Sequence, residues 1–196
     1  MEDRVRQLFG ASIEAKIAAV DLLSGLIAKA SLCLVHCLLN NGKIFVCGQG
    51  GSAANGLHFS TAMLNYFEVE RPGLPVISLT ADPAFLTACG HEGHFEHMFA
   101  RQLQALGQAG DVLLMLSTSG NAMSLLNVVH AAHDREMDVV VLSGRDGGLI
   151  VNHLGPEDIE LRVPGETAAH IREIHLAILH CFCDLIDQSL FGQMLG

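Results

Sequence analysis

Asp111-Val112-Leu113-Leu114-Met115-Leu116-Ser117-Thr118-Ser119-Gly120-Asn121 is the stretch of sequence that decides the fold. Its apolar run predicts a short buried strand, and the hydroxyl residues and glycine after the run predict a tight turn into a helix. At such a turn backbone N–H groups and hydroxyl groups converge, and the positive end of the helix dipole adds to their attraction for an anion. The stretch therefore predicts a phosphate-binding loop at Ser117, Thr118 and Ser119.

Four other short apolar runs predict further strands. They lie at residues 43–47, 75–79, 138–143 and 158–163, with helical patterns between them. Short apolar strands that alternate with helices predict a parallel sheet covered on both faces. The run at 158–163 alternates polar with apolar residues, which predicts an edge strand. We expect an α/β fold, a three-layer α-β-α sandwich with a five-stranded parallel sheet.

Long helical patterns stand near both ends of the chain. Apolar residues recur at three- and four-residue spacing over 6–39, which predicts one long helix or two helices broken near Ser24-Gly25. A last helix is predicted at 166–191. The first helix is more apolar than packing against a sheet requires, which predicts contact with another subunit. We expect one domain over 1–196, with 1–40 used in oligomerisation and 41–196 forming the sheet and its flanking helices.

A second glycine-rich loop, Gly48-Gln49-Gly50-Gly51-Ser52, follows the strand at 43–47 and leads into a helix predicted to start at Ala53. Ligands of parallel sheets bind outside the carboxyl ends of the strands, so this loop and the 117–121 loop are expected to line one crevice. A dinucleotide is a weak alternative ligand, because the loop lacks the third glycine of the GxGxxG pattern.

The composition limits the kinds of partner. Only 11 of the 196 residues are Lys or Arg, they are scattered, and the formal net charge is −10, so direct binding to DNA or RNA is not expected. No uninterrupted apolar window is long enough to cross a bilayer. The first residues lack the basic-then-apolar order of a signal peptide, which predicts a cytoplasmic protein.

Several motifs together resemble the sugar isomerase (SIS) domain family. The resemblance rests on the two loops, on His58-Phe59, and on motifs spread along the chain, namely Glu70-Arg71-Pro72, Gly110-Asp111-Val112-Leu113-Leu114, Gly144-Arg145-Asp146-Gly147-Gly148 and Cys183-Asp184-Leu185-Ile186-Asp187. Within the family the chain is most similar to phosphoheptose isomerases and to their relative DiaA, which associates with the replication initiator DnaA. The resemblance implies a flavodoxin-like SIS domain that assembles as a homotetramer.

The resemblance also implies where an isomerase site would stand. Phosphoheptose isomerases interconvert a ketose phosphate and an aldose phosphate at a zinc site, which uses a His and a Glu on one helix and a Gln and a His on the last helix. The corresponding residues here are His58, Ala62, Arg172 and His180. Ala62 can neither bind a metal nor transfer a proton, and Arg172 is a permanent cation. Two histidines should hold zinc poorly, because catalytic zinc generally uses three protein ligands.

The residues that the resemblance places around the sugar are altered as well. A basic residue is replaced by Tyr66, an Asn-Asp pair by His91-Glu92, and a serine by Ala122, for which Ser124 is a partial substitute. Losing one acid–base group alone typically costs roughly a hundred- to ten-thousand-fold in rate. The predicted phosphate- and sugar-binding residues are Gln49, Gly50, Gly51, Ser52, His91, Glu92, Ser117, Thr118, Ser119, Ser124 and Arg172.

These replacements favour a non-catalytic function. The first hypothesis is a DiaA-like protein with a degenerate isomerase site, which binds a DnaA-type initiator and regulates chromosomal replication initiation, with Leu190 and Phe191 on the partner surface. The alternative is an isomerase of sedoheptulose 7-phosphate or another sugar phosphate, with His180 as the catalytic residue. A third hypothesis is a sugar-phosphate sensor without turnover. No cofactor is expected, and any residual zinc would be held by His58 and His180.

Overall fold

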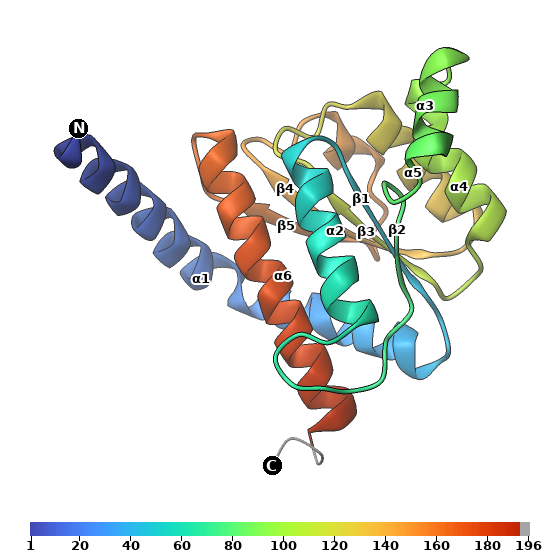
Figure 1. The fold of residues 1–196 in the computed structure, drawn as a ribbon, viewed down its shortest axis with the longest axis horizontal. Coiled ribbons are helices and arrows are strands. Elements are labelled where there is room, and N and C mark those ends of the chain that lie inside the picture. The colour runs from blue at the N-terminus through green and yellow to red at the C-terminus, as the bar shows by residue number, and fades with distance from the viewer. Residues whose placement is uncertain (193–196) are drawn as a thin grey trace.

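The chain folds around one five-stranded parallel sheet, in a computed structural model that describes residues 1–192 (Figure 1). The strand order is β2-β1-β3-β4-β5, so the two strands that precede the predicted loops are neighbours. The predicted fold class is confirmed, and the last strand lies at an edge. The strands are β1 (Ile44–Gly48), β2 (Val76–Ser78), β3 (Val112–Leu116), β4 (Asp138–Gly144) and β5 (Ile159–Val163).

Helices cover both faces of the sheet and complete the three layers. One hydrophobic cluster joins the sheet to α1, α2 and α6, and a second joins the opposite face to α3, α4 and α5. The α-helices are α1 (Glu2–Leu39), α2 (Gly51–Leu64), α3 (Pro83–His91), α4 (Met98–Leu106), α5 (Met123–Asp134) and α6 (Ala168–Phe191), and two short 3-10 helices are η1 (Phe95–His97) and η2 (Leu149–His153).

The central strand β3 consists of apolar residues only, because both of its faces are covered. Val112, Leu114 and Leu116 belong to the cluster with α1, α2 and α6. Leu113 and Met115 point the other way and belong to the cluster with α3, α4 and α5. All five side chains are buried, because successive residues of a strand face opposite sides and both sides are covered.

Two predicted helix boundaries differ from the structure. The N-terminal helix α1 is continuous through Ser24-Gly25, where the Ser24 hydroxyl donates a hydrogen bond to the Val20 carbonyl within the helix. Helix α2 begins at Gly51 and not at Ala53, because Gly50 has a positive φ of 55° and turns the chain directly from the loop into the helix. Gly51 and Ser52 therefore belong to the first turn of α2.

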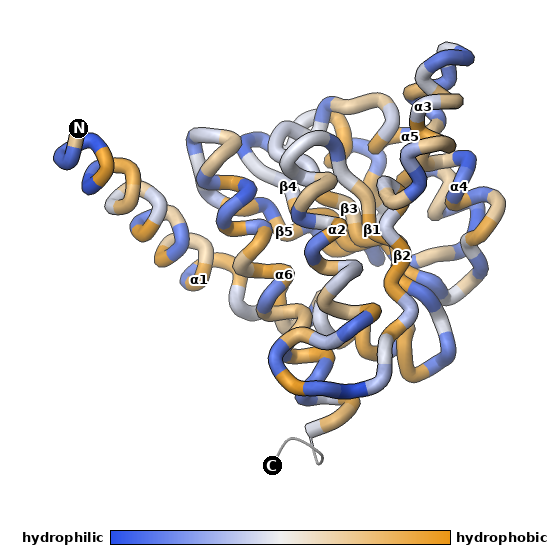
Figure 2. The backbone as a smooth tube through the Cα atoms, viewed as in Figure 1, coloured by the Kyte–Doolittle hydropathy of each residue, from blue (hydrophilic) through white to orange (hydrophobic). Residues whose placement is uncertain are grey.

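The N-terminal half of α1 projects from the body of the molecule (Figure 1). Ala19 is the first of its residues to be buried. Apolar residues, orange along the backbone in Figure 2, continue along the projecting part, and many of their side chains are exposed. The exposed apolar residues of α1 include Val5, Leu8, Phe9, Ile13, Ile17, Val20, Leu22, Leu26, Leu32 and Leu39.

Two helices, α1 and α6, reach the length and mean hydropathy of a membrane span. This differs from the expectation that no segment would, because the criterion averages hydropathy over a window and tolerates a few charged residues. In α6 the apolar residues belong to the hydrophobic cluster against the sheet, which is the pattern of a core helix.

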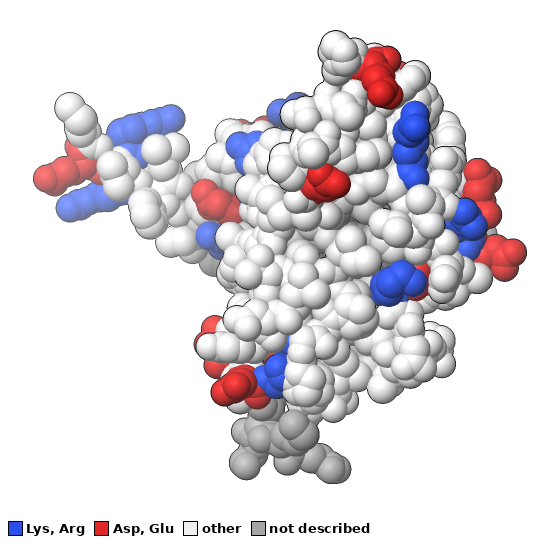
Figure 3. Space-filling model, turned by 45° about the vertical axis from the view of Figure 1, so that its right-hand side comes forward, with Lys and Arg blue, Asp and Glu red and all other residues white. Residues whose placement is uncertain are grey.

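Lys and Arg are placed singly over the face drawn in Figure 3.

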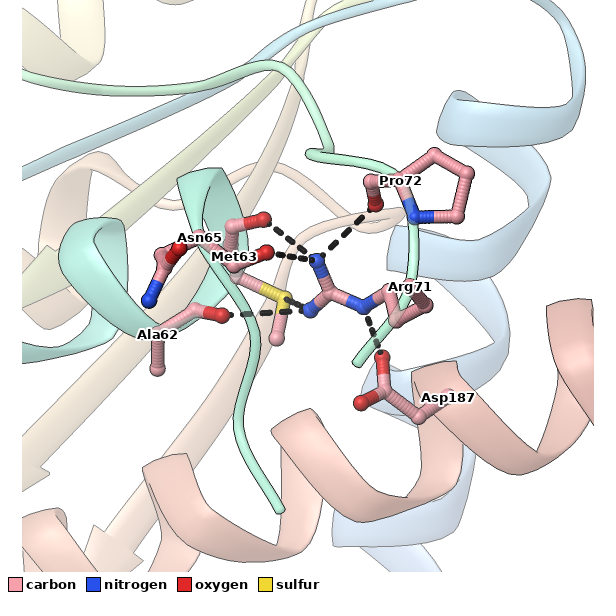
Figure 4. Close-up of polar contacts among 6 residues, drawn as sticks. All are labelled: Ala62, Met63, Asn65, Arg71, Pro72 and Asp187. Carbon is pink, nitrogen blue, oxygen red and sulfur yellow. Dashed lines mark hydrogen bonds and ion pairs between the residues drawn. The ribbon is translucent and has the colours of Figure 1, made fainter. Parts of the chain in front are cut away.

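A buried arginine ties α2 to α6 (Figure 4). The Arg71 side chain lies in the segment that follows α2, and its Nε donates to Asp187 Oδ1 of α6 at 2.8 Å. The two terminal nitrogens donate to main-chain carbonyls at the end of α2, including those of Ala62 at 3.1 Å and Met63 at 2.7 Å. These carbonyls have no partner within the helix, so Arg71 serves as a side-chain cap for α2.

A buried histidine fixes the middle of α6 to the sheet. His175 is fully buried, and its Nε2 lies 3.0 Å from the Ser143 carbonyl oxygen of β4. The hydrogen bond requires the proton on Nε2, and Nδ1 has no partner within residues 1–192. Burial lowers the pKa of His175 to about 4, although the hydrogen bond to Ser143 acts in the opposite direction.

We expect His175 to make the protein less stable as the pH is lowered. Between its unfolded pKa of about 6.5 and its folded value, the unfolded chain binds a proton that the folded chain does not, so the free energy of unfolding decreases as the pH decreases. The contribution of His175 to the free energy of unfolding should be about 2 kcal/mol smaller at pH 5 than at pH 8. Urea unfolding at both pH values measures this difference. In His175→Gln, which keeps a donor but does not titrate, the pH dependence should shrink by this amount, and equal pH dependence in both proteins would contradict the assignment.

Candidate active site

Two loops meet at the carboxyl edge of the sheet. The first, at Gln49 and Gly50, joins β1 to α2, and the second joins β3 to α5. Gly48 and Leu116, the last residues of the two strands, lie side by side in the register of the sheet. The Gln49 side-chain amide donates to the Ser124 hydroxyl in the first turn of α5 at 2.8 Å. The structure therefore brings both loops together, and the surface that they share is called the crevice.

The second loop holds its shape through its own hydroxyl and glycine groups. Ser117 is buried, and its hydroxyl accepts a hydrogen bond of 2.9 Å from the Gly120 N–H. Gly120 has a φ of 66°, and a β-carbon there would lie 1.8 Å from the Gly147 carbonyl oxygen, so only glycine fits. Thr118 and Ser119 are half-buried, and within residues 1–192 their hydroxyls make no hydrogen bond. This leaves both hydroxyls available for an anion.

A pair of histidines joins α2 and α6. The Nε2 atoms of His58 and His180 lie 2.9 Å apart, so one nitrogen donates a proton and the other accepts it. The Phe67 ring lies against His180 with a centroid distance of 5.5 Å. Burial, followed by the neighbouring His58, lowers the pKa of His180 below its ordinary value. Ala62, one turn beyond His58, adds only a buried methyl group.

The histidine pair borders an open groove between α1 and α6. The groove has a volume of about 570 Å³ and is lined mainly by apolar side chains, among them Val20, Ile27, Phe67 and Leu185, together with His180. Such a lining suits a hydrophobic surface better than a sugar.

Arg172 lies at the loop end of the same pair of helices. Its side chain covers Gly51, where a β-carbon would come within 2.6 Å of the Arg172 Cδ. The Asn55 side-chain amide of α2 donates to the Arg172 carbonyl oxygen at 2.9 Å and holds this turn of α6 in place. The guanidinium group is thereby placed beside the first loop.

The residues at the zinc site that the resemblance implies do not fit the metal. Of the four positions that the resemblance implies, only His58 and His180 offer a ligand, and their nitrogens already share a hydrogen bond. Among residues 1–192 no three His, Cys, Asp or Glu side chains are grouped as a metal site requires. Ala62 offers no ligand atom, and Arg172 brings a positive charge. We therefore derive no chemical step through zinc.

Two predicted residue sets make no hydrogen bond or ion pair with the two loops among residues 1–192. His91 ends α3 and Glu92 follows it, both exposed, and among residues 1–192 no hydrogen bond or ion pair joins either of them to the loops. Leu190 packs partly against the core, and the Phe191 ring lies 5.9 Å from the Arg71 guanidinium carbon. Both C-terminal residues thus have contacts within their own chain, while a role for His91-Glu92 in sugar binding stays a prediction.

The fold is that of a three-layer α/β protein with two loops at the carboxyl edge of a parallel sheet, and the comparisons with known proteins give its family. The SIS domain model matches residues 9–144, and the chain belongs to this family. A phosphoheptose isomerase of Methylococcus capsulatus is 49% identical over 191 residues, 97% of this chain and 98% of the relative. One of Halorhodospira halophila is 50% identical over 190 residues, 97% and 96% of the two chains. The solved structure of a phosphoheptose isomerase from Francisella tularensis is 46% identical, with a TM-score of 0.92, over 95% of this chain and 97% of that chain.

These relatives correct the functional prediction. The hypothesis of a non-catalytic DiaA-like regulator that binds DnaA is wrong, because relatives at about half identity over nearly the whole chain are named as isomerases. The prediction gave the replacements at Ala62 and Arg172 more weight than the agreement along the rest of the chain. Two substitutions change the site locally, but the similarity to the isomerase relatives extends over nearly the whole chain.

Proposed function

We propose that the chain is a sugar-phosphate isomerase of the phosphoheptose isomerase type, which interconverts a ketose phosphate and an aldose phosphate. The observation that carries the proposal is the identity of 49% and 50% to phosphoheptose isomerases over nearly the full length of both chains. The site supports it, because the loop between β1 and α2 meets the hydroxyl-rich loop between β3 and α5, and α2 also carries His58 of the histidine pair.

In this proposal the two ends of the substrate bind at different ends of the crevice. The phosphate group binds at Thr118 and Ser119, whose hydroxyls are available, with Ser52 in the first turn of α2 nearby. The carbonyl end lies at the histidine pair. Binding at both ends orients the reacting carbon atoms against the imidazole groups.

The reaction needs only proton transfers. One proton leaves C1 of the ketose, returns to C2, and the hydroxyl proton of O1 moves to O2, so no atom is gained or lost. His180 would move the carbon-bound proton, and His58 would exchange the proton on oxygen. In the structure the two Nε2 atoms are hydrogen-bonded to each other, so this contact would have to open before either imidazole exchanges a proton with the substrate.

Turnover of sedoheptulose 7-phosphate tests this proposal directly. The purified protein should convert it to the aldose phosphate, measured by chromatography of the product, at a rate that scales with protein concentration. Sedoheptulose without phosphate should not react, because the loop then has no anion to hold. No conversion at equimolar protein, with an intact circular dichroism spectrum, would overturn the proposal.

We also propose that the protein works as a homotetramer in the cytoplasm. The exposed apolar residues along α1 support assembly, because monomeric proteins rarely leave so extended an apolar surface in water. Assembly would cover α1 and the apolar groove next to His180. Sedimentation equilibrium should give four times the chain mass, and a monomer at micromolar concentration would contradict the assembly.

A further inference from the structure

Arg172 carries a charge that the described structure does not balance. None of the ion pairs among residues 1–192 includes Arg172, and its guanidinium group donates no hydrogen bond within this part of the chain. The other well-placed cations differ: Lys43 pairs with Asp111 at 2.9 Å, and Arg71 with Asp187 at 2.8 Å. The other Lys and Arg residues outside the ion pairs are exposed, whereas Arg172 is half-buried beside the first loop.

The position of Arg172 is fixed by two neighbours. Gly51 has no side chain, which leaves the space that the Arg172 Cδ and Nε occupy. The Asn55 amide holds the Arg172 carbonyl oxygen at 2.9 Å and sets where the side chain leaves α6. The guanidinium group is therefore confined to the crevice and does not extend freely into solvent.

The remaining three positions of the implied metal site offer no negative charge that would compensate this cation. Ala62 replaces a carboxylate, so the charge that would have balanced a metal ion is absent. His58 and His180 are neutral ligands that are bonded to each other. A divalent cation would have to separate the histidines, find a third ligand and approach a permanent positive charge, and each of these steps is unfavourable.

We propose that this crevice is a metal-free form of the family's site, in which Arg172 provides the fixed positive charge and, beside Gly51, binds the same phosphate group as the hydroxyls of Thr118 and Ser119. The choice of a phosphosugar as the ligand rests on the proposed function. Arg172 and His180 are eight residues apart on α6, about 12 Å along the helix axis. A ligand held at its phosphate by Arg172 would thus have its carbonyl end near the histidine pair.

The metal content of the protein tests the first half of the proposal. Protein produced in zinc-supplemented medium and then desalted should contain far less than one zinc per chain by elemental analysis. The double variant Ala62→Glu/Arg172→Gln restores a carboxylate and removes the cation, and it should rise toward one zinc per chain. About one tightly held zinc per chain in the unaltered protein would overturn the proposal, and this result does not depend on whether the variant folds.

The affinity for sedoheptulose 7-phosphate tests the second half. Calorimetry in the presence of a chelator should show binding, and Arg172→Gln should weaken it roughly ten- to hundredfold, because charge-assisted hydrogen bonds are lost. Arg101→Gln on α4, an exposed arginine on the opposite face of the sheet, is the matched control and should leave the affinity unchanged. Equal affinities of the unaltered protein and Arg172→Gln would overturn the role of Arg172.

The two proposals fail separately. A zinc-free protein that binds the phosphosugar through Arg172 but does not isomerise it would refute the proposed function and leave this inference intact. A protein that contains zinc and isomerises the phosphosugar would support the proposed function and refute this inference.

Discussion

Replacing Arg71 by Met should destabilise the protein by about 3–5 kcal/mol, the effect of breaking a buried ion pair by removing one partner. Met fills a similar volume, so the loss measures the polar contacts. The side chains of Arg71 and Asp187 are only 1% and 9% exposed, so water cannot replace the lost partner. The Ala62 carbonyl at the end of α2 would also lose its donor, while the Met63 carbonyl would keep only the Leu74 N–H. Urea unfolding at constant protein concentration measures the change.

Arg162 provides the control for this experiment. It pairs with Glu160 at 2.7 Å, but its side chain is 39% exposed, and an exposed pair is worth less than about 1 kcal/mol. Arg162→Met should therefore have a much smaller effect than Arg71→Met. In the double variant Arg71→Met/Asp187→Leu part of the stability should return, because no buried carboxylate is left without a partner. A loss below about 1 kcal/mol in Arg71→Met would show that the pair contributes little.

The consequences of Arg71→Met should reach the histidine pair. Arg71 holds the end of α2 against α6, and these two helices carry His58 and His180 (Figure 4). If the end of α2 becomes mobile, the separation of 2.9 Å between the two Nε2 atoms is no longer maintained. A fall in activity of Arg71→Met at temperatures well below its unfolding transition would show this coupling.

Local patterns predicted the sheet because each strand has its own signal. The run from Val112 to Leu116 is apolar throughout, and burial on both faces requires this pattern. Ser24-Gly25 carried a signal for a helix break that the structure does not follow, because a helix interior tolerates one glycine at modest cost when the flanking turns pack well. The glycines at positions 50 and 51 extended the first loop in the prediction, although the second of them already belongs to α2.

The contacts that build the site come from residues far apart in sequence. His58 and His180 are separated by 122 residues and Arg71 and Asp187 by 116, and no periodicity links such pairs. The histidines were found only through the resemblance to a known family. The motifs containing Arg71 and Asp187 were noticed, but nothing in either motif showed that they meet. A buried Arg followed by Pro just after a helix is the signal that could have suggested a cap.

Replacing His180 by Ala should lower kcat for sedoheptulose 7-phosphate by roughly a hundred- to ten-thousand-fold, the usual effect of removing a general acid–base group. KM should change little, because the phosphate loop is intact and the imidazole acts on the proton in the transition state. His153→Ala is the matched control: it breaks the other histidine pair, in which His130 Nε2 and His153 Nδ1 are also 2.9 Å apart, on the opposite side of the sheet. Both variants lose one imidazole and one contact between histidines, so only proximity to the crevice distinguishes them. Steady-state kinetics on the two variants decide the matter: equal kcat values would remove His180 from the chemistry, even if the protein is an isomerase.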